Sequence, residues 1–321
     1  MTTETQSPPA PRPSSPLAAR TLGLFGNPYL LLALTSLFWS GNHVVGRAVG
    51  GVVPPLALST FRWFIPTLLL WLFARQHIVR DWPTIVKSWK IMLWFGLTGG
   101  VLFTSLQYIG LEYTSALNVS VLNSLVPVLI LATSAVIFRD RVTPLQLAGI
   151  AISSLGVVVI IAHGDFAALL RLSFNWGDLL TLLTMIVFAI YSAYLRLRPP
   201  IHPMSFLFVL GATSAIGTFP FAIWEAASGF TLQPTLGTVL AIGYVAIFPS
   251  ILAYACWNRG IELIGANRAG PFLHLIPVYT AVLASTLLGE PLHLFHIAGF
   301  GLILSGVWLA SRKGKAAPKT A

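Results

Sequence analysis

Ten apolar stretches, each long enough to cross a lipid bilayer as a helix, follow one another along the chain. The hydrocarbon core of a bilayer is about 30 Å thick and takes about 20 residues of helix to span. Several connections are very short, such as 50–53 and 111–113, so neighbouring helices must run antiparallel and pack together. The pattern predicts an all-α, polytopic integral membrane protein with ten transmembrane helices. The predicted spans are 28–49, 54–74, 88–110, 114–138, 144–162, 175–197, 203–225, 235–260, 265–288 and 293–311.

Composition supports a chain embedded in a bilayer. Hydrophobic residues make up 56% of it and charged residues only 9%, whereas soluble domains carry about 25% charged residues. The mean hydropathy is +0.81. The formal net charge is +10, but the Lys and Arg residues are scattered in short clusters, so no nucleic-acid partner is expected. The single cysteine, Cys256, excludes an internal disulfide and a cysteine-based zinc site, and no cofactor or metal is expected.

The positions of the basic residues predict which side of the membrane each loop faces, because short cytoplasmic loops retain Lys and Arg. With the N-terminus inside, sixteen of the 19 Lys and Arg fall on the cytoplasmic side. Arg47 and Arg171 fall near the outer side, and Arg62 lies within the second span. The sequence predicts a location in the bacterial plasma (inner) membrane with both termini cytoplasmic. Residues 1–27 are expected to form a disordered tail, and 312–321 a basic tail.

The second half of the sequence repeats the first: Pro127 and Pro277 are 150 residues apart, and many identical or similar residues share this offset. The repeat predicts two five-helix units, 28–162 and 175–311, joined by an extracytoplasmic linker at 163–174. An odd number of spans forces the second unit to enter the membrane the opposite way up. Such inverted repeats are typical of secondary transporters. Further pairs in the same register are Gly110 with Gly260, Glu112 with Glu262, Asp140 with Glu290, Gly149 with Gly299, and Gly156 with Gly306.

Two long stretches, 111–160 and 261–310, carry a resemblance to a known family. Each has a central proline in LNSLVPV or FLHLIPV, then an acidic residue, then a helix with glycines. In this pattern the chain resembles the drug/metabolite transporter superfamily, and specifically its EamA-type ten-helix members. The likeness is closest to bacterial amino-acid and metabolite exporters, including the aromatic amino-acid exporter group. Arg62, in TFRWF, is similar to an arginine often found in the second helix of these proteins. The resemblance implies transport of small metabolites.

A small set of polar and aromatic residues is expected at useful depth in the membrane. Amides and hydroxyls suit the charged groups of a zwitterion and rings suit its side chain, although packing or lipid contact would also explain each ring. Arg62 would attract a substrate carboxylate or anchor carbonyls freed by a kink near Pro66. His43 and His274 would carry protons or hydrogen-bond a neighbouring helix. The candidate substrate-binding residues are Trp39, Asn42, His43, Arg62, Tyr108, Asn123, Tyr191, Tyr254 and His274, of which Trp39, Asn42, Tyr108, Tyr191 and His274 are predicted to surround one cavity.

Pro127 and Pro277 each remove a backbone hydrogen bond, which predicts a kink in the fourth and the ninth helix. The kinks would act as conformational hinges or would only improve packing. Structural charges are expected at the helix junctions: Arg47 and Glu112 at the outer face, and Glu262 at the inner face beside Arg259 and Arg268.

The function predicted from these patterns is secondary transport by alternating access, which exports small metabolites, foremost amino acids, or facilitates their passage. The protein is expected to act as a monomer in the bilayer. A proton-coupled exporter of drugs or other metabolites is an alternative, although no acidic residue is predicted at mid-membrane. An intramembrane enzyme or a passive channel is the alternative of another class. The sequence lacks H-E-x-x-H, G-x-S-x-G and the phosphate-binding loop, so no enzymatic activity is expected.

Overall fold

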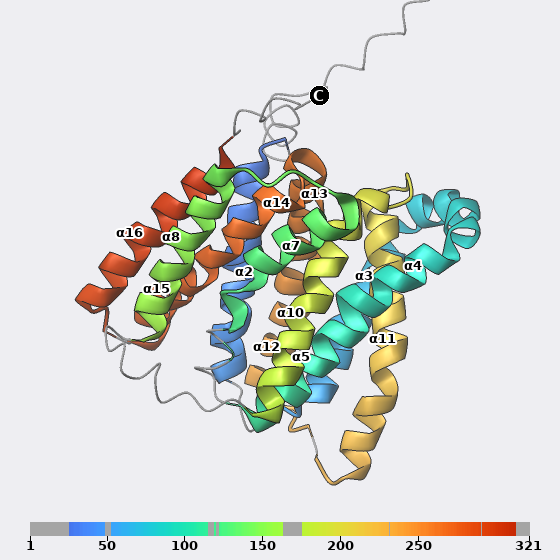
Figure 1. Ribbon diagram of the computed structural model, residues 1–321. Coiled ribbons are helices and arrows are strands. Elements are labelled where there is room, and N and C mark those ends of the chain that lie inside the picture. Colours follow the sequence, from blue (N-terminus) through green and yellow to red (C-terminus); the bar gives the residue numbers. More distant parts are fainter. Residues whose placement is uncertain are drawn as a thin grey trace, which may run out of the picture.

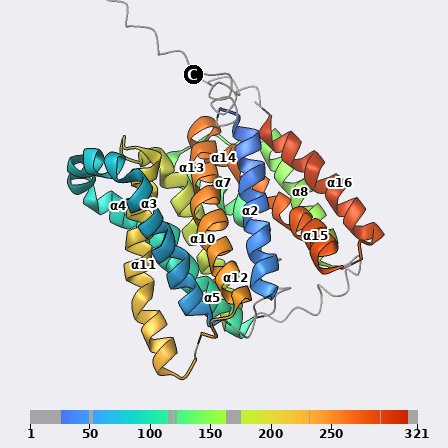
Figure 2. The ribbon, with the colours of Figure 1, turned by 180° about the vertical axis from the view of Figure 1, so that it is seen from behind.

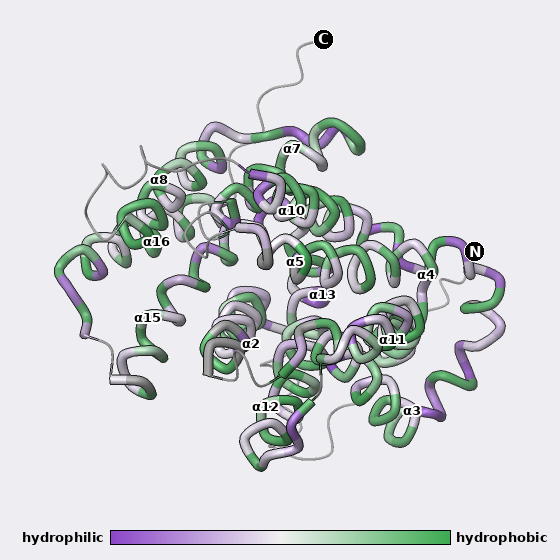
Figure 3. Tube along the Cα trace, turned by 90° about the horizontal axis from the view of Figure 1, so that it is seen from below, coloured by the Kyte–Doolittle hydropathy of each residue, from purple (hydrophilic) through white to green (hydrophobic). Residues whose placement is uncertain are grey.

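The computed structural model describes residues 26–48, 53–114, 119, 122–162, 175–230, 232–289 and 291–312. Throughout these residues the chain is helical and contains no strand, as the sequence predicted. Eight helical segments are long and apolar enough to cross a membrane, and Val126–Phe138 is a shorter apolar helix. Figure 3 shows hydrophobic residues along most of the helical lengths, with hydrophilic residues in short stretches between them.

The first half of the chain contains five helical spans in order. They are α2 (Pro28–Ala48), α3 (Pro55–Lys87), the continuous run of α4 (Trp89–Gly96), η1 (Leu97–Leu102) and α5 (Phe103–Tyr113), then α7 (Val126–Phe138) and α8 (Pro144–Ile161).

The second half contains five spans in the corresponding order. They are α10 (Trp176–Tyr194) with η2 (Leu195–Leu197), α11 (Pro203–Ala227), the run of α12 (Leu236–Ile247), η3 (Phe248–Leu252) and α13 (Ala253–Ile264), the run of α14 (Ala266–Ala269), η4 (Gly270–His274) and α15 (Leu275–Leu288), and α16 (Leu294–Ser311). The ten predicted spans therefore each correspond to a helical segment. The predicted tails and the linker fall largely outside the described residues, and Glu290 lies outside them as well.

Helices α8 and α16 lie side by side at one edge of the molecule, while α3, α4 and α11 occupy the opposite edge (Figures 1 and 2). Helices α2, α10 and α13 lie between these two groups (Figures 1 and 2). We call the end of the molecule that holds α14 and the C-terminal end of α13, at the top of Figure 1, the basic face. It carries Arg141, Arg196, Arg268 and Arg312.

In the α8–α16 pair, the two halves contact each other through equivalent sets of glycines. A Cβ on Gly306 would lie 2.5 Å from the Gly149 carbonyl oxygen, and a Cβ on Gly156 would lie 2.7 Å from the Gly299 carbonyl oxygen. An offset of 150 residues converts the first contact into the second. Glycine at these four positions lets the two backbones approach to contact distance, as small residues do between membrane helices. The halves thus meet through equivalent surfaces in antiparallel orientation, which is the arrangement expected of an inverted repeat.

Helix α3 extends beyond its predicted end. The sequence placed 75–87 in a connection because Arg, Asp and Gln interrupt the apolar run, whereas the structure continues the helix to Lys87. Ala74, Ile78 and Ile85 are buried at helical spacing along this extension. Asp81 is buried with them and accepts hydrogen bonds from the backbone N–H of residue 202, at 2.7 Å, and from the hydroxyl of Ser205, at 2.8 Å. The helix therefore continues through this polar region, where Asp81 hydrogen-bonds to the start of α11.

Candidate functional site

A cluster of aromatic side chains fills the centre of the molecule, between the two halves. Trp39 of α2 lies with its ring centroid 5.6 Å from Phe188 of α10, 5.8 Å from Tyr254 and 5.7 Å from Trp257, both of α13. Tyr191 of α10 is 6.1 Å from Tyr254. Phe188, Tyr191, Tyr254 and Trp257 are fully or almost fully buried, and Trp39 is partly buried. We call these five residues the aromatic cluster.

The polar atoms of the aromatic cluster are hydrogen-bonded to neighbouring helices. Tyr254 donates its hydroxyl to the carbonyl oxygen of Gly99 at 2.6 Å, and Trp39 donates Nε1–H to the carbonyl oxygen of Pro249 at 3.1 Å. Both acceptors lie in π-helical turns, η1 and η3, where the backbone ladder departs from the α pattern. The two turns end at Leu102 and Leu252, which are 150 residues apart, so they occupy equivalent positions in the two halves. Such turns are frequent at functional sites.

Two further contacts tie the cluster to amide and hydroxyl groups. Tyr191 donates its hydroxyl to Asn258 Oδ1 at 2.9 Å, and Trp257 donates Nε1–H to Ser192 Oγ at 3.2 Å. Asn258 is itself buried, and its Nδ2 has no hydrogen-bond partner among the described residues. Trp63 of α3 lies 5.3 Å from Tyr254 between ring centroids, and its buried Nε1 is also without a partner in the described part of the chain. Two buried donors at the cluster are thus available to a ligand or to water, because such groups are otherwise almost always paired.

Arg62 is buried at the edge of the cluster. Its Nε donates a hydrogen bond to Ser250 Oγ at 3.1 Å, and Ser250 in turn donates to the carbonyl oxygen of Val245 at 2.8 Å. The guanidinium carbon lies 5.8 Å from the Trp63 ring centroid. No carboxylate of the described residues forms an ion pair with Arg62. The contact with Ser250 fits the anchoring interpretation, and the guanidinium lies next to the Trp63 ring, whose Nε1 is one of the two donors described above.

His274 has its hydrogen-bonding partners elsewhere. Its Nε2 donates to the carbonyl oxygen of Ser124 at 3.0 Å, and its Nδ1 lies 2.7 Å from Ser153 Oγ. Ser124 is the residue equivalent to His274 in the other half, since their numbers differ by 150, so the two halves touch at matching positions. The side chain links η4 to α8 and to the turn before α7. Trp39 and Tyr191 therefore meet in the cluster, whereas His274 is bonded at a separate helix junction.

Of the other candidates, Asn42 and Asn123 are half-buried. The side chains of His43, Arg47, Tyr108 and Glu112 lie outside what the structure describes.

The two prolines lie where an α-helix begins. Pro127 is in the first turn of α7, after a non-helical turn at Ser124 and Leu125, and Pro277 is in the first turn of α15, after the 3₁₀ segment η4. A helix needs no backbone N–H in its first turn, so proline is accommodated there without loss. The expected kink within a long helix is therefore an interruption of the helix just before each proline.

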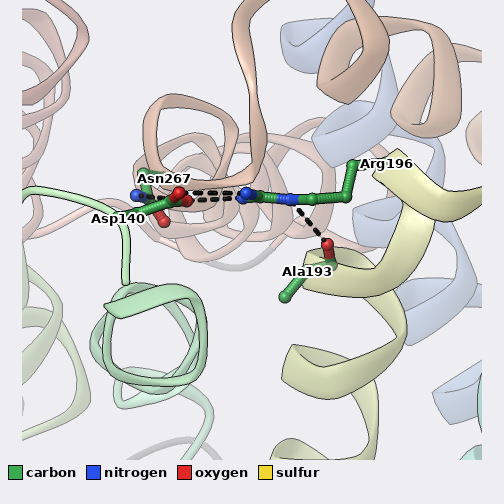
Figure 4. Close-up of polar contacts among 4 residues, drawn as sticks. All are labelled: Asp140, Ala193, Arg196 and Asn267. Atoms are coloured by element: carbon green, nitrogen blue, oxygen red, sulfur yellow. Dashed lines mark hydrogen bonds and ion pairs between the residues drawn. The ribbon is translucent and has the colours of Figure 1, made fainter. Parts of the chain in front are cut away.

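An ion pair between Asp140 and Arg196 joins the halves at the basic face, and further ion pairs there lie within the second half. Asp140 accepts two hydrogen bonds from Arg196, at 2.9 and 2.5 Å, and Asn267 Nδ2 donates to the same carboxylate at 3.4 Å (Figure 4). Glu262 pairs with Arg198 at 3.2 Å and with Arg259 at 3.1 Å. Arg268, which the sequence also placed beside Glu262, forms no ion pair with it.

Residues missed from the sequence are Phe188, Trp257, Asn258 and Trp63. Asn258 follows Tyr254 by four residues in α13, which places both on one helix face, and this spacing was a usable signal. The signal in α3 was weaker, because Trp63 is one of many aromatic residues in apolar spans.

Two stretches, residues 27–162 and 175–312, each match the EamA-like transporter family. The chain belongs to the EamA-like transporter family. This EamA-like protein is therefore a membrane transporter, and the two matches correspond to its two halves.

Individual relatives cover nearly all of this transporter. It is 28% identical over 297 residues to "Uncharacterized transporter YyaM" of Bacillus subtilis (strain 168), across 89% of this chain and 93% of that protein. It is 26% identical over 294 residues to "Uncharacterized inner membrane transporter YedA" of Escherichia coli (strain K12), across 90% and 91%. A crystal structure with 20% sequence identity has a TM-score of 0.72 and covers 88% of this chain and 95% of its own, which shows a shared fold.

Proposed function

We propose that this EamA-like transporter moves small metabolites, foremost amino acids, by alternating access around the aromatic cluster. The observation that carries the proposal is a pair of buried donors beside the rings, Asn258 Nδ2 and Trp63 Nε1, for which the described part of the chain offers no hydrogen-bond partner. A substrate carboxylate would accept hydrogen bonds from both donors, and the charge of Arg62 would favour it. The rings of Trp39 and Tyr254 would contact the apolar side chain of the substrate.

The two halves would provide the two conformations. Because the repeat is inverted, exchanging the shapes of the halves converts a site open to one side into a site open to the other. The structure carries an ion pair between the halves at the basic face, Asp140 with Arg196, and this pair would break when that face opens. The interruptions before Pro127 and Pro277 are suited to be the hinges, because the regular α-helical hydrogen-bond pattern is broken there, by a turn at Ser124 and Leu125 and by the 3₁₀ segment η4.

The proposed setting is the bacterial inner membrane, with the basic face and both termini in the cytoplasm and export as the direction. The relative from E. coli is named as an inner membrane transporter, which supports this setting. The protein is proposed to function as a monomer because each chain contains both halves of the site. Transport rather than catalysis is expected.

The test is counterflow into liposomes that contain the purified full-length protein. A labelled panel of amino acids, amines and sugars is supplied outside, and unlabelled candidates are loaded inside. We expect saturable uptake of at least one amino acid that is stimulated by the same amino acid inside, because a carrier exchanges substrates whereas a pore does not. A second series with an imposed pH gradient measures proton coupling.

Matched variants connect the flux to the cluster. Trp39→Leu removes a cluster ring, and Trp71→Leu removes a ring from the exposed surface of α3, where Trp71 is 44% exposed. We expect Trp39→Leu to reduce amino-acid counterflow at least tenfold and Trp71→Leu to leave it within twofold. Equal flux in both variants, or counterflow of sugars or amines with none of amino acids, would contradict the proposal.

A further inference from the structure

A polar recess of about 380 Å³ opens at the basic face, apart from the aromatic cluster. Its lining comes from both halves of the chain: from the α7–α8 connection in the first, and from η2, α14 and the end of α16 in the second. A water molecule takes about 30 Å³ of liquid volume, so the recess has room for roughly a dozen waters or for a phosphate with a small polar substituent.

The recess has an excess of positive charge. Among the residues that the structure describes, its lining includes Arg141, Arg196, Arg268 and Arg312 and one carboxylate, Asp140. That carboxylate accepts hydrogen bonds from the two terminal guanidinium nitrogens of Arg196, Nη1 and Nη2, so the pair is close to neutral (Figure 4). Arg268 and Arg312 add further positive charge to the recess.

Two of these arginines are placed to receive an anion. Arg268 is half-buried, and no acidic side chain of the described residues pairs with it. Arg312 is exposed at the end of α16, with its guanidinium carbon 3.6 Å from the centroid of the Trp308 ring. Stacking on a ring holds the guanidinium group in place and leaves its edge N–H donors free to bind phosphate oxygens.

The neighbourhood of the recess is a lipid boundary. On α8 and α16, the helices that flank it, Leu147, Leu304 and Trp308 have more than half of their side-chain surface exposed. Apolar side chains exposed on membrane helices face acyl chains, and the basic recess lies at the ends of these helices. Basic pockets between membrane helices on the cytoplasmic side bind anionic headgroups.

We propose that this recess is a binding site for a phosphate-bearing anion, supplied by the headgroup of an anionic phospholipid or by free phosphate. The anion would contact Arg268 and Arg312 directly. Because Asp140, Arg141, Thr143 and Gln146 of the first half also line the recess, the anion would lie at the junction of the two halves, and its binding would stabilise the arrangement seen here. The inference concerns binding alone and does not depend on which substrate is transported.

The test uses the purified full-length protein in a neutral detergent. Its unfolding midpoint is followed while phosphatidylglycerol, phosphatidylcholine or inorganic phosphate is added, and native mass spectrometry counts the lipids that remain bound. We expect a saturable rise in the midpoint with phosphatidylglycerol that phosphatidylcholine does not give. A rise with inorganic phosphate alone identifies free phosphate as a sufficient ligand, and a rise with phosphatidylglycerol alone identifies the lipid.

Variants locate the effect. Arg268→Gln and Arg312→Gln each remove one charge from the recess, and Arg75→Gln removes one from the exposed surface of α3, outside it. We expect the two recess variants to need at least tenfold more anion for half of the rise, and Arg75→Gln to match the unmodified protein. Arg312 lies at an exposed helix end, so its variant reports on binding even if Arg268→Gln folds poorly. Equal stabilisation by phosphatidylcholine, or equal anion binding in all three variants, would overturn the proposal.

Discussion

The contact between α8 and α16 leads to a sharp prediction about a single methyl group. In Gly306→Ala the added Cβ would lie 2.5 Å from both the Gly149 carbonyl oxygen and the Ser153 backbone nitrogen. Ordinary van der Waals contact begins at 3.4 Å, so the two helices must separate by about 0.9 Å at this point. Neither obstacle is a flexible side chain that could turn away. Overpacking of this kind costs about 1–3 kcal/mol of unfolding free energy.

Gly301→Ala is the matched control, because it makes the same substitution in the same helix with no atom within 4 Å of the new Cβ. Alanine favours helix over glycine by about 0.5–1 kcal/mol, so this control should be neutral or slightly more stable. Thermal unfolding of both purified variants in the same detergent gives the comparison. If Gly306→Ala is as stable as Gly301→Ala, the backbones of α8 and α16 do not approach as closely as described. The argument that the two halves pack through equivalent surfaces would then fail.

Three further predictions follow from single contacts. Tyr191→Phe should lower the unfolding free energy by about 1–3 kcal/mol, because Asn258 Oδ1 loses its buried donor; retention of full stability would show that the hydroxyl is not engaged. Glu225→Gln should destabilise by a similar amount, about 1–3 kcal/mol in urea-based unfolding, because the carboxylate accepts two backbone N–H groups at the start of α3 and an amide offers only one acceptor. Burial and the neighbouring His77 lower the pKa of His202 below its usual 6.5, so the folded protein favours the neutral ring. Stability should therefore be highest above pH 6.5 and fall as the pH drops from there toward the lowered pKa. His202→Asn supplies a side-chain oxygen in place of the ring Nδ1 that accepts from Met204 N–H, so it should flatten this profile, and an unchanged profile would assign the titration to another group.

The sequence was sufficient for the spans and the repeat, because both depend on long patterns. A stretch of about twenty apolar residues in a chain of this composition has few possible structures other than a membrane-spanning helix. The 150-residue offset holds for pairs from Gly110 with Gly260 to Gly156 with Gly306, which fixes the alignment of the two halves. Glycines at 149, 156, 299 and 306 permit close packing between membrane helices. What the pattern could not give was their pairing, Gly149 with Gly306 and Gly156 with Gly299, because contacts between distant helices leave no local trace.

The candidate site was predicted in part. Trp39, Tyr191 and Tyr254 come together, since the deep aromatic residues of central helices have little else to pack against. The π-helical turns that supply their acceptors have no reliable sequence signal, and so the positions of Gly99 and Pro249 in the site could not be anticipated.

Helix ends were the other gap. From the sequence, Asp81 indicated a solvated connection after the helix. In the structure its carboxylate accepts hydrogen bonds from residues at the start of α11, so the charged residue lies inside a longer helix and holds it against α11. His274 posed the opposite problem: depth alone suggested a site residue, and only three-dimensional packing reveals its bonds to Ser153 and Ser124.

The four glycines of α8 and α16 have a mechanical consequence. The backbones of these two helices are in contact at two points. Sliding one helix along the other would bring the carbonyl oxygens of one helix against the backbone of the other. We therefore expect this pair to move as one rigid unit, so that in the proposed alternating-access cycle the other eight spans would move relative to it. Spin labels on α8 and α16 should keep one fixed separation through the whole transport cycle while labels elsewhere report two.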